Sequence, residues 1–438
     1  MHCLPKHLFV MTCCLAPLFA QVPDGWFVVS SFAHGTATPG GLFLTHPRSP
    51  GAPLVVQGLG PDLTGVGANT TGANCVAVEQ NTGEVLVGEI GPPGTNIDLH
   101  RIAITGNVAT RLALIPVGTV RFPSTGGGIN AIAMLPDGDA ILAVTDLVNQ
   151  PPFHSAILVR YSRSTGALTA IPTGPLLGNC NAVTVNPSGN TIYFVVSGMG
   201  LFSLPIAGGP ATMVTNQFGN AQGLAVDSQD RIYVTDLADL YRIDPSSTGG
   251  TTSFTVGANI NGVSIEAATD QPVTVLNGLI AGPGVHWCTN TGTANLLTNG
   301  ITGVGSGIAV RNSPRSYGEA TPGSFVYRWR TAPAPGGLPL RGNLGFGLRV
   351  DPVGSQPSLG FLVANWQPGF TTLLGMQVLI DPNNAVNLGL LVPGTVTPAP
   401  LPASLPAGLQ FYVQGFFVDT GAPQGIAATD GQVVVTIQ

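Results

Sequence analysis

The sequence is poor in charged residues. They make up 8% of its 438 residues, against about a quarter in an average soluble domain. Lys6 is the single lysine, so the chain after residue 20 holds 14 arginines and 21 acidic residues, a net charge of about −7. An acidic surface with so few cations does not suit a phosphate backbone, so we expect no nucleic-acid partner.

Long apolar runs are also missing after the N-terminus. Residues 1–20 combine the basic Lys6 with an apolar segment over residues 8–20 that ends in Ala20. This pattern is typical of a cleaved secretory signal peptide, so we expect export and a mature chain that begins at Gln21. No later run approaches the ~18 apolar residues that a transmembrane helix needs, so no transmembrane segment is predicted.

Cysteine is scarce in the expected mature chain. Three of the six cysteines fall within the predicted signal peptide, and Cys75, Cys180 and Cys288 remain. An odd number in an exported protein leaves at least one thiol without an intramolecular partner, so the sequence does not predict a disulfide framework. We expect Cys75 and Cys180 to be buried free thiols.

The abundant residues are glycine and proline, 60 and 38 in number, in a chain that is 44% hydrophobic. That hydrophobicity excludes disorder and favours many short strands joined by turns. An apolar segment followed by a polar turn and further apolar segments recurs five times, at intervals of 39 to 56 residues. The first segments of the five copies are NCVAV (74–78), NAIAM (130–134), NAVTV (181–185), GLAV (223–226) and NGVSI (261–265).

Each copy contains four apolar segments, which is the pattern of a four-stranded propeller blade. Residues 26–58 supply a second, third and fourth segment without a first. SGIAV (306–310) is a first segment with nothing after it. Joining the two would complete a sixth blade from both ends of the repeat region, and a ring closed in this way has no free edge between its first and last blades.

Two of the copies carry a family resemblance, namely QGLAVDSQDRIYVTDLADLYRIDP (222–245) and CNAVTVNPSGNTIYFVVSG (180–198). They resemble the repeats of the NHL and gluconolactonase-like six-bladed β-propellers. The resemblance covers about residues 25–311 and implies an all-β fold. Together with the shared N- and C-terminal blade that the repeat pattern predicts, it defines a predicted propeller domain over residues 21–312. Hydrolases, lyases and binding modules all occur on this fold, so the resemblance does not by itself imply an activity.

Residues 313–438 form a second predicted domain. Their alternating apolar segments between Pro/Gly turns predict an antiparallel β-sandwich. The region is similar to a β-rich C-terminal region that recurs in large secreted bacterial proteins, and this resemblance implies no activity. The residues that carry it are Tyr317, Gly318, Thr321, Pro322, Gly323 and PLRGN (339–343).

The usual catalytic signatures are missing from the sequence, which contains no G-x-S-x-G, G-x-G-x-x-G, H-E-x-x-H or C-x-x-C motif. His100 and His286 fall in the third segment of their copies, where Phe and Tyr stand in others, so we expect both to be packing residues. The sequence therefore offers no ready-made catalytic centre.

One set of residues could form a site. The residue that opens the innermost strand of each predicted blade should lie at one mouth of the central channel. We call these the ring residues: Asn74, Asn130, Asn181, Gln222, Asn261 and Ser306. They predict a ring of five amides and one hydroxyl that binds a ligand, or alternatively a set of side chains that hydrogen-bond between neighbouring blades.

In gluconolactonase-like enzymes the same positions hold a divalent metal, and Asn130 and Asn181 match asparagine ligands of that pattern. Gln222 and Ser306 stand where the resemblance implies acidic ligands. Calcium affinity follows the number of carboxylates, so we expect no cofactor and favour a non-enzymatic binding protein for an unknown protein or small molecule. The alternative is a metal-dependent lactone hydrolase, with Glu89, Asp146 and Asp236 as further candidates for metal ligand or base.

Overall fold

The computed structural model describes residue 22 and most of residues 25–435. Within that range it leaves out residues 34–38, 46–51, 66–70, 81, 122–126, 150–156, 175, 177–178, 228–229, 245–250, 256–258, 267–270, 277–283, 289–293, 313–314, 318–325, 332–343, 345, 354–358, 374–375, 394, 406–408 and 430. The predicted signal peptide, residues 1–20, lies outside the described residues.

The strands of residues 27–310 pair antiparallel into six groups of four, which we call units 1 to 6. Unit 1 joins the two ends of this region. Its inner strand β25 (Val304–Val310) pairs with β1 (Phe27–Ala33), which is followed by β2 (Gly41–Thr45) and β3 (Leu54–Val55). Val28 lies opposite Ala309 in the register of β1 and β25, so the pairing that the incomplete first repeat predicts is present.

Units 2 to 6 each take their strands from one continuous stretch of chain. Unit 2 is β4 (Thr71–Val78), β5 (Val85–Gly91), β6 (Asn96–Thr105) and β7 (Val108–Val120), and unit 3 is β8 (Gly127–Met134), β9 (Ala140–Thr145), β11 (Leu158–Tyr161) and β12 (Leu168–Ala170). Unit 4 is β13 (Cys180–Val185), β14 (Thr191–Val196), β15 (Gly200–Pro205) and β16 (Thr212–Thr215). Unit 5 is β17 (Gly223–Val226), β18 (Ile232–Asp236), β19 (Asp239–Ile243) and β20 (Thr251–Thr255), and unit 6 is β21 (Ile260–Glu266), β22 (Gln271–Leu276), β23 (Val285–Cys288) and β24 (Ala294–Thr298).

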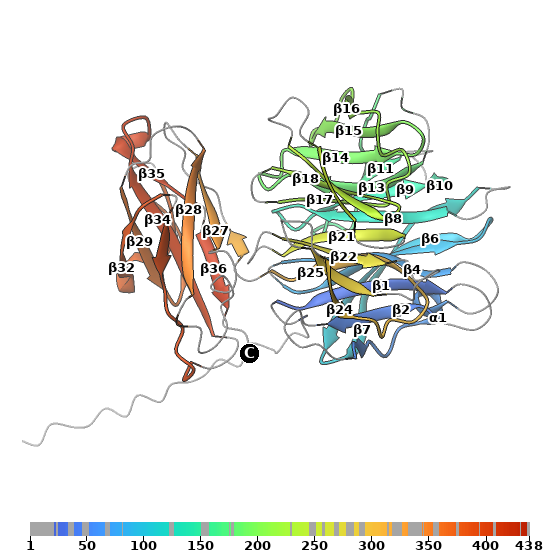
Figure 1. The fold of residues 1–438 in the computed structure, drawn as a ribbon, viewed down its shortest axis with the longest axis horizontal. Coiled ribbons are helices and arrows are strands. Elements are labelled where there is room, and N and C mark those ends of the chain that lie inside the picture. The colour runs from blue at the N-terminus through green and yellow to red at the C-terminus, as the bar shows by residue number, and fades with distance from the viewer. Residues whose placement is uncertain are drawn as a thin grey trace, which may run out of the picture.

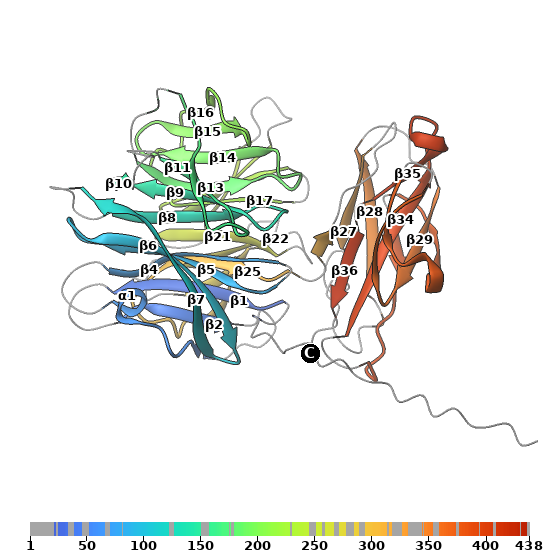
Figure 2. The same ribbon diagram turned by 180° about the vertical axis from the view of Figure 1, so that it is seen from behind.

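Units 1, 2 and 3 are less separate than the repeat predicts. Two residue pairs join β1 to β4 and two more join β5 to β8, so these units form one 13-stranded sheet. The short strand β10 (Leu147–Asn149) belongs to the unit 3 segment but pairs with the long outer strand β7. Figure 2 labels both strands. A side chain at Gly128 would place its Cβ 2.2 Å from the Glu89 carbonyl oxygen, so only glycine permits the close approach of β8 to β5.

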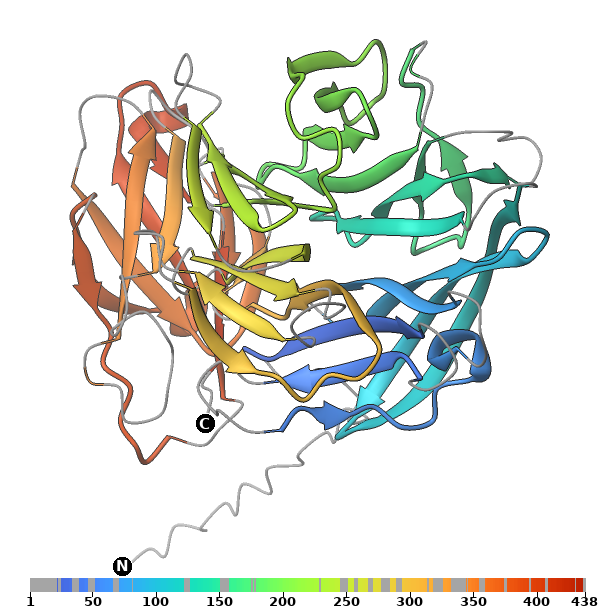
Figure 3. The ribbon, with the colours of Figure 1, turned by 45° about the vertical axis from the view of Figure 1, so that its right-hand side comes forward.

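The inner strands of successive units contact one another, and β25 of unit 1 contacts β4 of unit 2. Figure 3 shows the units following one another from blue through green to yellow about one centre. Six hydrophobic clusters lie between successive units, and each draws residues from both units that it joins. Full burial of a side chain such as Phe27 or Tyr233 contributes about 1.5–3 kcal/mol, so the units stabilise one another.

A salt bridge adds a polar link between units 2 and 3. Arg163 Nη2 lies 3.1 Å from Glu84 Oε2, and Arg101 Nε donates to the same carboxylate at 2.6 Å. Burial raises the pKa of Glu84, but the hydrogen bond from Arg101 and the charges of Arg163 and Arg101 outweigh burial and leave that pKa below its usual value. The carboxylate is therefore ionised at neutral pH.

A buried arginine ties the beginning of the described chain to the end of unit 1. Arg311 is 2% exposed, and its Nη1 donates to the Val22 carbonyl at 2.6 Å. The Arg311 backbone N–H donates to the Trp26 carbonyl, and its carbonyl accepts from the Gly25 N–H. Val22 is itself fully buried in a hydrophobic cluster, so this residue is part of the packed structure.

The strands after residue 314 pair among themselves in the part of the chain that the structure describes, and Figure 1 draws them in orange and red. The largest sheet contains β26 (Arg315–Tyr317), β36 (Gly431–Val435), β34 (Gln410–Val418), β29 (Gly360–Asn365), β32 (Val386–Leu391) and β35 (Ile426–Ala428). Two smaller sheets contain β27 (Val326–Thr331), β28 (Gly347–Val353) and β33 (Val396–Pro398), and β30 (Pro368–Leu373) and β31 (Met376–Ile380). Helical turns are short: α1 (Pro61–Thr64), Pro382–Asn384 and Pro423–Gly425.

Candidate functional site

Five of the six ring residues sit at β-bulges. The register between an inner strand and its neighbour slips by one residue at Asn74, Asn130, Asn181, Asn261 and Ser306. A bulged residue is left out of the ladder, and its side chain is turned away from the regular face of the sheet. Gln222 directly precedes β17, and its backbone N–H donates to the Thr235 carbonyl at 3.2 Å. The bulge therefore sets the direction of the ring side chains.

Four ring residues each donate a hydrogen bond to the next unit in the same way. In each case the side chain donates to the carbonyl of the residue just before the next ring residue. These bonds are Asn74 Nδ2 to Ile129 O (3.0 Å), Asn130 Nδ2 to Cys180 O (3.1 Å), Asn261 Nδ2 to Gly305 O (2.8 Å) and Ser306 Oγ to Ala73 O (3.3 Å). The last of them joins unit 1 to unit 2, so the predicted bonds between neighbouring units are present at these positions.

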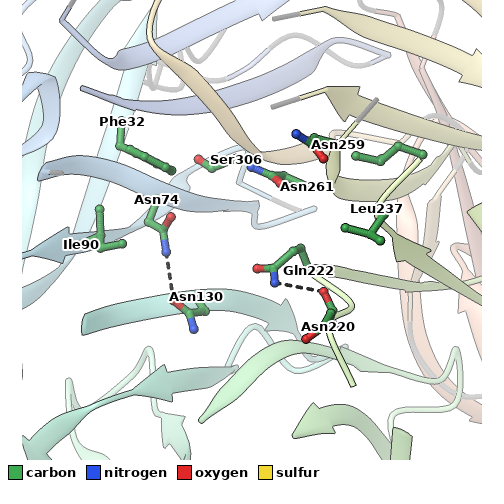
Figure 4. A pocket seen from close by; sticks show the side chains of 11 residues that line it. Phe32, Asn74, Ile90, Asn130, Asn220, Gln222, Leu237, Asn259, Asn261 and Ser306 are labelled. Carbon is green, nitrogen blue, oxygen red and sulfur yellow. Dashed lines mark hydrogen bonds between the residues drawn. The ribbon is translucent and has the colours of Figure 1, made fainter. Parts of the chain in front are cut away.

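Asn74 and Asn130 are further linked to each other and to a second strand. Asn74 Nδ2 donates to Asn130 Oδ1 at 3.1 Å, which Figure 4 shows, and Asn130 Nδ2 donates to Thr145 Oγ1 at 2.5 Å. Thr145 Oγ1 in turn donates to the Cys180 carbonyl at 3.0 Å. Both amide N–H groups of each asparagine are thus directed at protein acceptors.

Asn181 and Gln222 depart from this pattern. Within the described residues, the Gln222 amide donates to the Asn220 carbonyl two residues earlier, at 3.1 Å, and to no other acceptor. The Asn181 side chain makes no hydrogen bond within the described part of the chain. The side-chain bonds to the next unit are therefore made by Asn261, Ser306, Asn74 and Asn130. Within the described residues, Asn181 and Gln222 make no bond of this kind.

A cavity of about 410 Å³ opens among the ring residues. Figure 4 shows the side chains around it, and none of the described residues that line it is charged. Five of the ring residues line it, Asn181 being the exception. The other lining residues are Phe32, Ile90, Asn220, Leu237, Asn259 and Ile260.

These additional lining residues were not among the sequence-based candidates, although part of the pattern was visible. Asn220 and Asn259 each precede a ring residue by two positions. Both lie before the strand of their unit begins. Phe32 and Leu237 lie on other strands or turns, and only the fold brings them to the cavity.

A second cavity has a volume of about 380 Å³. Its wall includes consecutive residues from all six inner strands, namely 76–78, 132–134, 183–185, 224–226, 263–265 and 308–310. The inner strands of all six units therefore line one cavity, together with polar residues that include Gln80, Asp227 and Asn312.

The three acidic candidates lie outside the described lining of the polar cavity. Glu89 is 6% exposed; its carboxylate pairs with His100 Nε2 through Oε1 and accepts the Asp98 N–H through Oε2 at 2.9 Å. Asp98 is half-buried, and its pKa is raised by burial and then by the charge of Glu89. The Glu89 carboxylate therefore serves contacts within unit 2.

Asp146 and Asp236 each follow a threonine of a second strand. Asp146 has a left-handed backbone with a φ of 54°, and its carbonyl accepts the Arg121 N–H at 2.9 Å. Burial raises the pKa of Asp236, and the charge of Asp239, its partner across the hairpin, adds to the effect. Within the described residues no group of three His, Cys, Asp or Glu side chains is arranged to hold a metal ion.

The remaining candidates are packed. His100 is fully buried, and burial lowers the pKa of the half-buried His286, so both occupy packing positions as predicted. Cys75, Cys180 and Cys288 are free and buried. Burial raises the pKa of Cys75 and Cys180 strongly and that of Cys288 to about 11. Protonated, enclosed thiols are not nucleophiles at neutral pH.

Comparisons with known proteins give the chain no family. No family model matches it, and no curated protein matches its sequence. Similar solved structures include a nidogen/laminin complex (10% identity, TM-score 0.46, 65% of this chain and 98% of that one) and TolB from Acinetobacter baumannii (12%, 0.46, 66% and 67%). A candidate gluconolactonase shares 14% identity at a TM-score of 0.36, with 65% and 92% covered.

At these identities and TM-scores the similar structures carry no conclusion about what this chain does.

No helix among the described residues is long and apolar enough to cross a bilayer.

Proposed function

We propose that the chain is an exported binding protein in which residues 21–312 form a closed six-bladed β-propeller and residues 313–438 a β-sandwich. The ligand binds in the polar cavity at the mouth of the central channel. The observation that carries the proposal is the lining of that cavity, which combines amides, a hydroxyl and apolar side chains without a described charge. Concave pockets of this volume, with a few convergent polar groups, are typical small-molecule sites.

Closure of the ring is supported by three features of unit 1. β1 pairs with β25, the hydrophobic cluster around Phe27 joins unit 1 to unit 6, and Ser306 donates to the Ala73 carbonyl of unit 2. A chain that ends after residue 315 should fold as a propeller, because β25 still pairs with β1. A chain that ends before Gly300 should aggregate or lose cooperative melting, and equal stability of the two chains would contradict a shared blade.

The lactone-hydrolase alternative needs a metal and a general base near the substrate. Calcium prefers six to eight oxygen ligands that include carboxylates, whereas the described cavity wall offers neutral groups. Glu89, the most buried of the acidic candidates, already holds His100 and the Asp98 N–H. These observations favour binding over hydrolysis.

Calcium titration tests this choice directly. A ligand that binds only the folded state at a hundredfold excess over its Kd stabilises it by about 2.7 kcal/mol, which would raise the Tm by several degrees. We expect millimolar calcium to leave the Tm unchanged and lactones to show no turnover above background. A calcium-dependent rise that Glu89→Gln abolishes would favour the hydrolase instead.

Binding at the mouth itself can be tested by blocking it. Gln222 is exposed at the edge of the cavity, so Gln222→Trp should fill the cavity without disturbing the core. Gln217, exposed on the same segment but outside the described lining, provides the control variant Gln217→Trp. In a ligand-observed NMR screen we expect neutral polar fragments to bind the wild type and the control and to lose binding to Gln222→Trp. A screen in which no fragment distinguishes the two variants would overturn the proposal.

Export has its own test. The mature chain should begin at or near Gln21, so intact-mass analysis of protein recovered from the medium should show that Lys6 is absent. A secreted form that retains Lys6 would contradict the signal peptide.

A further inference from the structure

We infer that the ligand of the polar cavity is a neutral saccharide. The inference rests on the proposed binding function and adds the chemical class of the ligand. It follows from three properties of the cavity wall: which hydrogen-bonding groups remain available, where the apolar side chains lie, and what charge the described wall carries.

The inner part of the wall presents acceptors. The amide nitrogens of Asn74 and Asn130 each donate to two protein acceptors, and an amide nitrogen has two N–H groups to give. Their remaining capacity lies on the carbonyl oxygens. A ligand that reaches these two residues must therefore bring donors, as a hydroxyl group does.

The outer part of the wall can both donate and accept. Gln222 uses one amide N–H for the Asn220 carbonyl, and no described residue bonds to the other N–H or to its carbonyl oxygen. The Asn220 and Asn259 side chains make no hydrogen bond within the described part of the chain and line the same cavity. A hydroxyl group donates and accepts at once, so neighbouring hydroxyls of one ring can satisfy both kinds of side-chain amide group.

Apolar side chains complete the wall. Phe32 and Leu237 line the cavity together with the amides, and Figure 4 shows Leu237 on the side of Gln222. Leu237 is 64% exposed and has a φ of 54°, a left-handed conformation that costs a non-glycine residue free energy and is concentrated at ligand sites. A sugar ring offers C–H faces to such side chains and hydroxyl edges to the amides.

The absence of charge from the described wall argues against other ligand classes. An anion would meet the carbonyl oxygens of Asn74 and Asn130 without a cation to balance it. A divalent cation would lack the carboxylates that its affinity requires. A neutral ligand rich in hydroxyl groups is the class that leaves no charge unpaired.

The test is titration of the full chain with glucose, galactose, mannose, N-acetylglucosamine and their common disaccharides. Binding is measured by isothermal titration calorimetry or by saturation-transfer NMR. We expect at least one of these sugars to bind with a millimolar or lower Kd. Gln222→Ala removes one hydrogen-bonding partner and should raise that Kd about threefold to tenfold. Leu237→Ala removes apolar contact and should raise it by a similar factor, whereas Gln217→Ala should leave it unchanged.

Two other probes separate this inference from the proposed function. If N-acetyl-triglycine amide, a peptide without charged termini, binds in a Gln222-dependent manner and no sugar does, the cavity is a binding site and the saccharide is wrong. Sugar binding that neither Gln222→Ala nor Leu237→Ala weakens would also overturn the inference, because the sugar would lie elsewhere. If no probe responds to either variant and the Gln222→Trp screen is also negative, the proposed function fails together with the saccharide.

Discussion

Two asparagines at equivalent positions of neighbouring units allow the structural role of the ring to be measured. Replacing Asn130 by alanine removes its two donated bonds, to Thr145 Oγ1 and to the Cys180 carbonyl, and the bond that it accepts from Asn74. Replacing Asn181 removes the same atoms from the same place in unit 4. The Asn181 side chain makes no hydrogen bond within the described residues. The two variants therefore remove the same atoms and differ in the hydrogen bonds that are lost.

The expected magnitude follows from the partners that remain. A hydrogen bond contributes about 1 kcal/mol net, so three would give about 3 kcal/mol. The Cys180 carbonyl keeps its bond from Thr145, and Asn74 keeps its bond to Ile129, which lowers the expected loss for Asn130→Ala to about 2 kcal/mol. The Tm should fall by about 2 °C for a chain of 438 residues. Asn181→Ala should stay within about 0.5 kcal/mol of the wild type.

Urea denaturation and scanning calorimetry of the three proteins side by side provide the measurement. Equal destabilisation by both substitutions would show that the ring stabilises the fold by some property other than these bonds. No effect from either would show that the bonds between units 2, 3 and 4 contribute nothing, and the interpretation of the ring as a connector would be wrong.

Three further predictions concern contacts outside the cavity. Arg311→Ala should lower the free energy of unfolding by about 2 kcal/mol, since it leaves the buried Val22 carbonyl without this donor; urea denaturation checks this, and a loss below about 0.5 kcal/mol would contradict it. Because the folded-state pKa of Glu84 lies below its ordinary value, the stability that this group contributes is present above its unfolded pKa and is lost as pH falls from about 5 towards 3, so Glu84→Gln should be less acid-sensitive in melting experiments. Because burial raises the pKa of Cys75 and Cys180, Ellman's reagent at pH 8 should label these thiols only in denaturant, and rapid labelling of the native protein would contradict their burial.

The sequence predicted the strands of the repeat region well because each lies in a short apolar segment between polar turns. NAVTV became the greater part of β13, and the orphan segment at 306–310 pairs with β1 as expected. Six-bladed closure, the β-sandwich and the signal peptide stay predictions. A short apolar segment bounded by turn residues indicates a buried strand without any knowledge of the partner strand.

The bulges and the linked sheets could not be predicted in the same way. A bulge at Asn130 depends on the register between β8 and β9, and one residue of slip leaves the composition of both strands unchanged. The fusion of units 2 and 3 depends on the close approach of Gly128 to the Glu89 carbonyl, a contact between distant segments. The cavity wall combines Phe32, Leu237 and ring residues from separate units, and only the finished fold brings these together.

The pairing of β1 with β25 also fixes when folding can finish. The first strand of unit 1 leaves the ribosome about 280 residues before its inner partner, a delay of roughly 15–60 s at 5–20 residues per second. During that time β1 can pair with β2 but has no inner neighbour, and the buried faces of Phe27 and Val29 wait for β25 and unit 6. The pairing of β1 with β25 is therefore a late step of folding that joins strands far apart in the sequence, and contacts of this kind form slowly.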